Sequence, residues 1–149
     1  IGIDGVLIVD CPPEELLDFS ISLNEKKIDT IYLVAPTTPE KRVKHIVQKG
    51  SGYIYYVSLK GVTGANHLDL KEVSSRLKLI RKYSELPIAV GFGISSEESA
   101  KNVANTIADG VIVGSALIKL MENAESENKC PINEASIFIK KLSEAIKGI

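Results

Sequence analysis

Five short apolar segments, each followed by a stretch long enough for a helix, organise this chain. They are rich in Val, Ile and Tyr and cover residues 6–9, 31–35, 53–57, 88–90 and 111–113. Each is almost continuously apolar, which is typical of strands buried on both faces of a parallel sheet. The pattern therefore predicts five parallel strands.

The stretches between these segments carry apolar residues three or four positions apart, the spacing of one helix face. The predicted stripes are Leu16, Phe19 and Leu23; Val43, Ile46 and Val47; Val73, Leu77 and Ile80; and Ala100, Val103, Ala104 and Ile107. Start signals are Pro12-Pro13 with Glu14 and Glu15 for the first helix, Pro39-Glu40 for the second, and a capping box of Ser95 with Glu98 for the fourth.

Two more helices are expected after the last strand. A short one covers residues 116–121 and a longer one residues 131–147, joined by a polar, exposed linker at 122–129. The apolar side of the longer helix carries Ala135, Phe138, Ile139, Leu142 and Ile146. The repeated strand–helix unit predicts a parallel sheet with right-handed crossovers.

Five such units fit either an open flavodoxin-like sheet or part of a (β/α)8 TIM barrel. The extra short helix and the glycines that end the last two strands favour the C-terminal portion of a barrel. We therefore interpret residues 1–149 as a single partial domain that lacks about three strands. The first residues, Ile1 to Gly5, resemble the approach to a strand, so we expect the chain to begin inside a larger protein.

The composition excludes several classes of partner and site. Of the 149 residues 44% are hydrophobic and 25% charged, and the formal net charge is −1, which argues against nucleic acid or an anionic membrane as the main partner. No apolar run reaches the 18 or more residues of a membrane span. Cys11 and Cys130 do not form a C-x-x-C pair, so we expect a cytoplasmic protein with no metal site and no disulfide framework.

Two glycine turns carry the main chemical signal. Residues 91–95 read Gly-Phe-Gly-Ile-Ser and residues 114–116 read Gly-Ser-Ala, each at the end of a predicted strand and before a helix. Glycine lets the backbone approach an anion closely, and a helix start offers unpaired amides. Neither turn contains Lys or Arg, so amides and dipoles would hold the anion. Glycines can also simply permit tight turns, but two such turns on consecutive strands favour a phosphate site.

Other polar residues are less specific. Residues 58–68 are long for a strand-to-helix loop and contain two glycines and Thr63, which suits either a mobile lid or a solvated connector. His45 and His67 have no metal-ligand partner at a suitable spacing, so we interpret both as surface residues. Asp10 is either a functional carboxylate or a cap for the following helix, and we slightly favour the cap.

These segments together resemble the alpha subunit of tryptophan synthase. The matching pieces are Asp-Gly-Val-Leu-Ile-Val-Asp at 4–10, Gly-Tyr-Ile-Tyr-Tyr-Val-Ser at 52–58, Gly-Val-Thr-Gly-Ala at 61–65, and the two glycine turns at 91–95 and 114–116. The resemblance covers essentially the whole chain. The Gly-Val-Thr-Gly and Gly-Phe-Gly-Ile-Ser segments are specific as a pair, whereas each alone is a weak signal.

The resemblance implies a function and roles for individual residues. The family is a lyase that cleaves indole-3-glycerol phosphate to indole and glyceraldehyde 3-phosphate by a retro-aldol step. It works in an alpha2-beta2 complex with a beta subunit that carries pyridoxal phosphate, and needs no cofactor of its own. The implied substrate and phosphate residues are Tyr55, Gly64, Gly91, Phe92, Gly93, Gly114 and Ser115, and Thr63 would orient a catalytic carboxylate. The surface near Cys11-Pro12 and residues 58–68 would face the beta subunit.

The same resemblance implies what this segment lacks. The family's glutamate and aspartate acid–base pair comes from an earlier part of the barrel, so no catalytic residue is assigned here and Asp10 does not replace them. Leu59-Lys60 departs from relatives that carry arginine before the lid. We expect the isolated segment to be inactive and, because half a barrel exposes strand edges and its inner face, to self-associate. The alternatives are another phosphate-binding barrel enzyme or a non-catalytic sugar-phosphate-binding module.

Overall fold

Five parallel strands form one sheet in the order in which they occur along the chain. The computed structural model describes residues 2–58, 69–91 and 93–147. The strands are β1 (Gly5–Leu7), β2 (Asp29–Val34), β3 (Ile54–Val57), β4 (Ile88–Gly91) and β5 (Gly110–Ile112), and each pairs in parallel with the next. This order requires each connecting helix to cross over the same face of the sheet.

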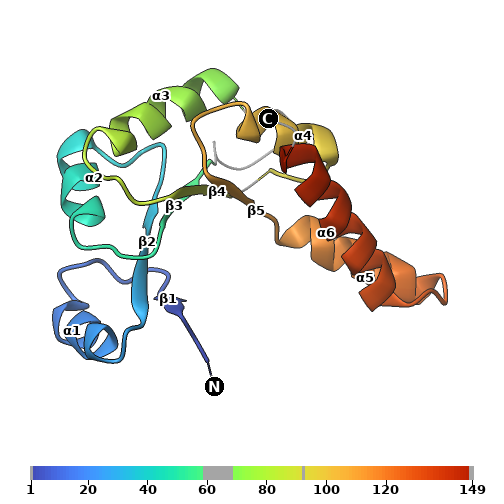
Figure 1. The fold of residues 1–149 in the computed structure, drawn as a ribbon, viewed down its shortest axis with the longest axis horizontal. Helices are drawn as coiled ribbons and strands as arrows, with labels where there is room; N and C mark the ends of the chain where they lie inside the picture. The colour runs from blue at the N-terminus through green and yellow to red at the C-terminus, as the bar shows by residue number, and fades with distance from the viewer. Residues whose placement is uncertain (1, 59–68, 92, 148–149) are drawn as a thin grey trace.

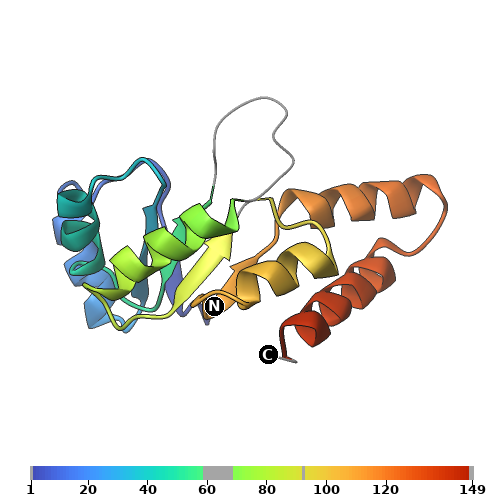
Figure 2. The ribbon, with the colours of Figure 1, turned by 90° about the horizontal axis from the view of Figure 1, so that it is seen from above.

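The sheet is curved into an arc, and the connecting helices lie on its convex side (Figure 1). These helices are α1 (Leu17–Glu25), α2 (Glu40–Val47), α3 (Leu70–Arg81) and α4 (Glu97–Ala104). After β5, α5 (Ser115–Ser126) runs outward and α6 (Pro131–Lys147) returns beside it, packing against both α5 and α4 (Figure 2). The prediction of part of a barrel, rather than a flat open sheet, is confirmed.

The main core lies between the convex face and the helices. Strand residues at alternate positions point into it, among them Tyr32, Val34, Ile54, Tyr56, Ile88 and Val90, all at most 4% exposed. The predicted stripes of α2 and α3 cover them and are fully buried. The alternation follows from the period of two in a strand.

The concave face is only half-buried, as expected for half a barrel, which exposes its inner face. Leu33, Tyr55 and Ala89 are paired across β2, β3 and β4, so they share this face, and each is intermediate in exposure. No second layer from the described residues covers them. The almost continuous apolar sequence therefore fits strands whose second face is covered only in a closed barrel.

Helix boundaries differ from the prediction at several points. α2 follows Pro39 as predicted, but α1 begins only at Leu17, after a turn, and Phe19 of its predicted stripe is 46% exposed. The capping box of α4 is formed by Ser96 and Ser99, not by Ser95 and Glu98. A serine at the third helical position reaches back to the cap as a glutamate would.

The C-terminal part also differs. α5 continues to Ser126, so most of the predicted 122–129 linker is helical. Phe138, Leu142 and Ile146 of α6 pack on the core as predicted, but Ile139 is 45% exposed. Ile107 lies beyond the end of α4 and is 40% exposed.

Side chains connect the strands at the amino end of the sheet. Asp109, just before β5, accepts hydrogen bonds from the Ile88 N–H (2.7 Å) and from Arg81 (2.5 Å), and Arg81 also donates to the Leu86 carbonyl (2.9 Å). On the neighbouring strands, the hydroxyl oxygen of Ser51 accepts from the Thr30 N–H at 2.9 Å. These contacts fix the strand starts opposite the candidate site.

Candidate functional site

The two glycine turns lie side by side at the carboxyl ends of β4 and β5. Gly91, the last residue of β4, is paired with Ile112, the last residue of β5. Each turn begins directly after this pair, so Gly93 and Gly114 lie two residues beyond it. Gly93, Gly114 and Ser115 are exposed, and Gly93 has a φ of 76°, a conformation that favours glycine.

The helices that follow the two turns begin differently. In α4 the Ser96 hydroxyl accepts from the Ser99 N–H at 3.2 Å, so its first turn already has a side-chain cap. In α5 the N-cap residue is Gly114 and no side chain caps the helix. The Leu117 N–H donates to the Gly114 carbonyl at 2.9 Å, so among the described residues the Ser115 and Ala116 amides are left for an outside acceptor, and the helix dipole favours a negative one.

Tyr55 lies against the backbone at the start of the first turn. It is paired with Leu33 and Ala89 on the concave face, and a Cβ built on Gly91 would overlap its hydroxyl and lie 2.5 Å from its ring carbon Cζ. A side chain at position 91 would therefore require this ring to move. Burial raises the pKa of Tyr55 above its usual range, so its hydroxyl is a neutral donor near pH 7.

The structure thus brings together five of the predicted site residues at one edge of the arc: Tyr55, Gly91, Gly93, Gly114 and Ser115. Thr63, Gly64 and Phe92 lie outside the described residues, as do His67 and Leu59-Lys60. Neither turn has a Lys or Arg among its described residues, so an anion there would be bound by backbone groups.

Asp10 does not cap α1, which corrects our preferred interpretation. The N-cap of α1 is Leu16, with no side-chain cap, and Asp10 is an exposed residue with a φ of 61° in the turn after β1. Aspartate is one of the few residues that adopt this conformation readily. The conformation of the turn therefore accounts for an aspartate at position 10.

An ion cluster beside this turn was not predicted. Glu14 forms a two-point contact with Arg42 of α2, and His45 Nε2 lies 3.0 Å from Glu14 Oε1. The hydrogen bonds from Arg42 lower the pKa of Glu14 to about 2. Partners separated by 28 residues leave no local pattern in the sequence, so only the packing of α2 beside the turn reveals them.

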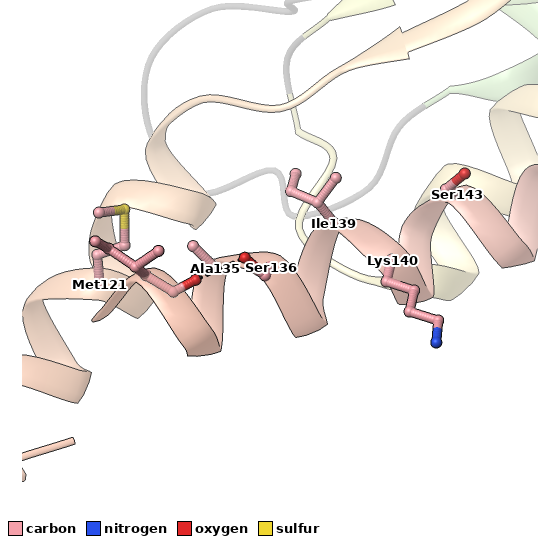
Figure 3. Close-up of a pocket in the computed structure, with 7 residues that line it drawn as sticks. Met121, Ala135, Ser136, Ile139, Lys140 and Ser143 are labelled. Atoms are coloured by element: carbon pink, nitrogen blue, oxygen red, sulfur yellow. Dashed lines mark hydrogen bonds between the residues drawn. The ribbon is translucent and has the colours of Figure 1, made fainter. Parts of the chain in front are cut away.

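Apolar surface is concentrated at the two ends of the arc. The exposed large apolar side chains of the described residues are Ile3, Val9, Phe19, Ile21, Ile107, Ile118, Ile132, Ile137 and Ile139. On α5 and α6 they border an open groove of about 600 Å³ lined by Met121, Ala135 and Ile139 (Figure 3). This groove is formed by helix side chains and contains no residue of the glycine turns.

Comparison with known proteins identifies the family. The family model described as tryptophan synthase alpha chain matches residues 1–147. The chain is 48% identical over 145 residues to the tryptophan synthase alpha chain of Polynucleobacter necessarius, covering 97% of this chain and 54% of the relative. It is 51% identical over 126 residues to that of Chromobacterium violaceum, covering 85% and 48%.

The chain belongs to the tryptophan synthase alpha chain family.

Solved structures agree. The alpha subunit from Legionella pneumophila superposes with a TM-score of 0.83 at 37% identity, covering 99% of this chain and 53% of that one. The tryptophan synthase a2b2 complex from Pyrococcus furiosus gives a TM-score of 0.76 at 35% identity, covering 99% and 57%. The chain thus spans about half the length of the alpha chains that it matches. None of the helices in the described ranges is long and apolar enough to cross a membrane.

Proposed function

We propose that this chain is the phosphate-binding portion of a tryptophan synthase alpha chain, a lyase that cleaves indole-3-glycerol phosphate to indole and glyceraldehyde 3-phosphate. The observation that carries the proposal is the pair of adjacent glycine turns at the carboxyl ends of β4 and β5, one of which leads into a helix without a side-chain cap. Membership of the family supports the choice of reaction.

In this proposal the phosphate lies between the two turns. Gly93, Gly114 and Ser115 bind it through backbone amides and the serine hydroxyl, and Gly64 joins them. Gly91 and Phe92 shape the same pocket, and Tyr55 lines the space on the concave side where the rest of the substrate would lie. Thr63 orients a carboxylate that this segment does not contain.

Binding of this kind has a definite physical character. Amides and a helix dipole stabilise an anion less than paired guanidinium groups do, but they are fixed by the fold and are insensitive to pH. The site therefore selects for a small phosphate that fits between the turns. It contributes position and orientation, and the proton transfers of the lyase step need acid and base groups supplied by other residues.

We propose further that residues 1–149 act as one partial domain with no lyase activity of their own. The open concave face and the apolar residues at both ends of the arc support this, because they are surfaces that a closed barrel would cover. Measuring indole release from indole-3-glycerol phosphate tests it. Turnover at the rate of an alpha chain of full length would contradict it.

The partner in the proposal is a tryptophan synthase beta subunit, in an alpha2-beta2 complex in the cytoplasm, with pyridoxal phosphate carried by the beta subunit. The structure of such a complex from Pyrococcus furiosus supports this assembly. The turn at Cys11-Pro12, beside the Glu14–Arg42 ion pair, supplies part of the contact surface.

The phosphate site is tested by titrating the 15N-labelled chain with inorganic phosphate and following its amide signals. Gly93, Gly114 and Ser115 should shift together. Ser115→Pro removes one amide at the first helical position of α5, where proline is tolerated, and should abolish the shifts. Glu97→Pro makes the matched change in α4 and should leave them. The proposal is contradicted if phosphate does not shift these signals in the unsubstituted chain. It is also contradicted if the shifts remain in Ser115→Pro.

A further inference from the structure

Ser58 makes a double contact with the last residue of β4. It follows β3 directly, and the Gly91 carbonyl oxygen accepts both the Ser58 N–H at 3.0 Å and the Ser58 hydroxyl at 2.9 Å. Ser58 is half-buried and Gly91 is buried. A carbonyl oxygen has two lone pairs, so it accepts both hydrogen bonds at once.

Only one of the two bonds depends on the residue type. The N–H bond continues the parallel ladder in which Val57 is paired with Gly91, and any residue except proline would make it. The hydroxyl bond is an addition that requires serine or threonine. It acts at the one carbonyl that separates β4 from the first glycine turn.

A second contact from β3 also restrains Gly91. Tyr55, also on β3, fills the space next to the Gly91 α-carbon, so that a side chain there would require the ring to move. Two residues of β3 therefore hold Gly91, one through its carbonyl and one through packing. These two contacts restrain Gly91 at the point where β4 ends and the first glycine turn begins.

We infer that Ser58 is a positioning residue for the anion site, a role that rests on the proposed function. By holding the Gly91 carbonyl, its hydroxyl keeps the first glycine turn at the distance and angle from the Gly114-Ser115 turn that one phosphate requires. It acts through the backbone of Gly91.

The experiment compares three variants of the 149-residue chain by inorganic phosphate affinity and by melting temperature. Ser58→Ala removes the hydroxyl, and Ser58→Thr keeps it. Ser51→Ala is the matched control, because Ser51 is also half-buried and its hydroxyl oxygen binds a backbone group, the Thr30 N–H, at the other end of the sheet.

Loss of one hydrogen bond of this kind should weaken phosphate binding about threefold to tenfold in Ser58→Ala. Ser58→Thr should bind as the unsubstituted chain does. Ser51→Ala leaves the buried Thr30 N–H without its acceptor, so it should lower the melting temperature by a few degrees, at least as much as Ser58→Ala does, without changing phosphate affinity. This contrast separates positioning from general stability.

Two results would overturn the inference. If Ser58→Ala binds phosphate as tightly as the unsubstituted chain, Ser58 has only a structural role, while the proposed function stands. If the unsubstituted chain shows no phosphate binding, the proposed function fails and the inference fails with it. Should Ser58→Ala not fold, Ser58→Thr and Ser58→Val are compared. Threefold tighter binding by the threonine variant supports the inference, and equal binding overturns it.

Discussion

The Tyr55 ring lies so close to the α-carbon of Gly91 that a methyl group added to the glycine would overlap the tyrosine hydroxyl. The two residues belong to neighbouring strands and share the concave face of the sheet. This contact explains why a glycine ends β4 even though its backbone has no positive φ. The requirement at Gly91 is steric, whereas that at Gly93 is conformational.

Gly91→Ala should therefore displace the Tyr55 ring towards the open concave face and destabilise the fold by about 1 kcal/mol, the low end of the cost of overpacking, because the ring can move aside. Equilibrium denaturation by urea measures this. Shortening the tyrosine should relieve the clash, so that Gly91→Ala with Tyr55→Ala costs less than the sum of the two single changes.

The matched control is Tyr55→Phe. Its ring carbon Cζ would still lie 2.5 Å from the added methyl group, so this change should not rescue Gly91→Ala. Rescue by phenylalanine would mean that the hydroxyl alone causes the conflict. Additive single effects would mean that the two residues do not compete for the space.

A second prediction concerns the hydroxyl of Tyr56. Tyr56 is 0% exposed, and its hydroxyl has no hydrogen-bond partner among the described residues. A buried polar group without a partner is destabilising, so Tyr56→Phe should leave the free energy of unfolding unchanged or raise it by about 1 kcal/mol. A loss of stability beyond that range would reveal a partner for the hydroxyl.

The pH dependence gives an independent check on Tyr56. Burial raises its pKa from 10.0 to about 12 in the folded chain. The unfolded state therefore loses its proton first, so ionisation of this group costs no stability below pH 10 and lowers the free energy of unfolding as the pH rises towards 12. The melting temperature of Tyr56→Phe should fall less steeply over that range than that of the unsubstituted chain.

A third prediction concerns acid stability. The hydrogen bonds from Arg42 lower the pKa of Glu14 from 4.5 to about 2. Because the pKa of Glu14 is lower in the folded than in the unfolded state, its ionised carboxylate stabilises the fold above pH 4.5. This contribution disappears as the pH falls from 4.5 towards 2. The difference in melting temperature between the unsubstituted chain and Arg42→Leu should shrink over that window. Because the pair is exposed, the effect should also shrink in high salt. A constant difference would contradict it.

A fourth prediction concerns association. The apolar groove on α5 and α6 should make the chain self-associate, and Ile139→Lys should weaken that association at least about tenfold, because it replaces buried apolar area by a charge. Asn102→Lys adds the same charge to the exposed face of α4, away from this groove, and is the control. Sedimentation velocity measures both. Equal association in all three proteins would show that the groove takes no part.

Much of the fold was predictable because its signals are local. The stripes of α2 and α3 bury every residue assigned to them, and Pro39 places the start of α2 correctly. Runs of β-branched residues and the repeated strand–helix unit were sufficient for the parallel sheet. The glycine turns could be recognised because close backbone approach restricts the residue type at the position itself.

The errors have physical causes. Phe19 and Ile139 have helical spacing, but α1 and α6 lie at the ends of the arc, where only one of their sides meets the described core. The observed cap of α4 lies one residue after the predicted one, because three nearby serines, Ser95, Ser96 and Ser99, can each form cap hydrogen bonds. The Glu14–Arg42 pair and the Ser58–Gly91 contact join residues 28 and 33 positions apart and depend on which segments the fold brings together.

The contacts at the amino end of the sheet stabilise the fold, whereas the candidate site lies at the opposite end. Asp109 and Arg81 join the starts of β4 and β5, far from the glycine turns. Backbone amides near Ile88 should therefore exchange with solvent most slowly, and those of the turns fastest. Because the scaffold is held at this end, residues of the opposite edge other than Gly91 and Gly93 can be substituted, so that new ligand preferences can arise there while the chain stays folded.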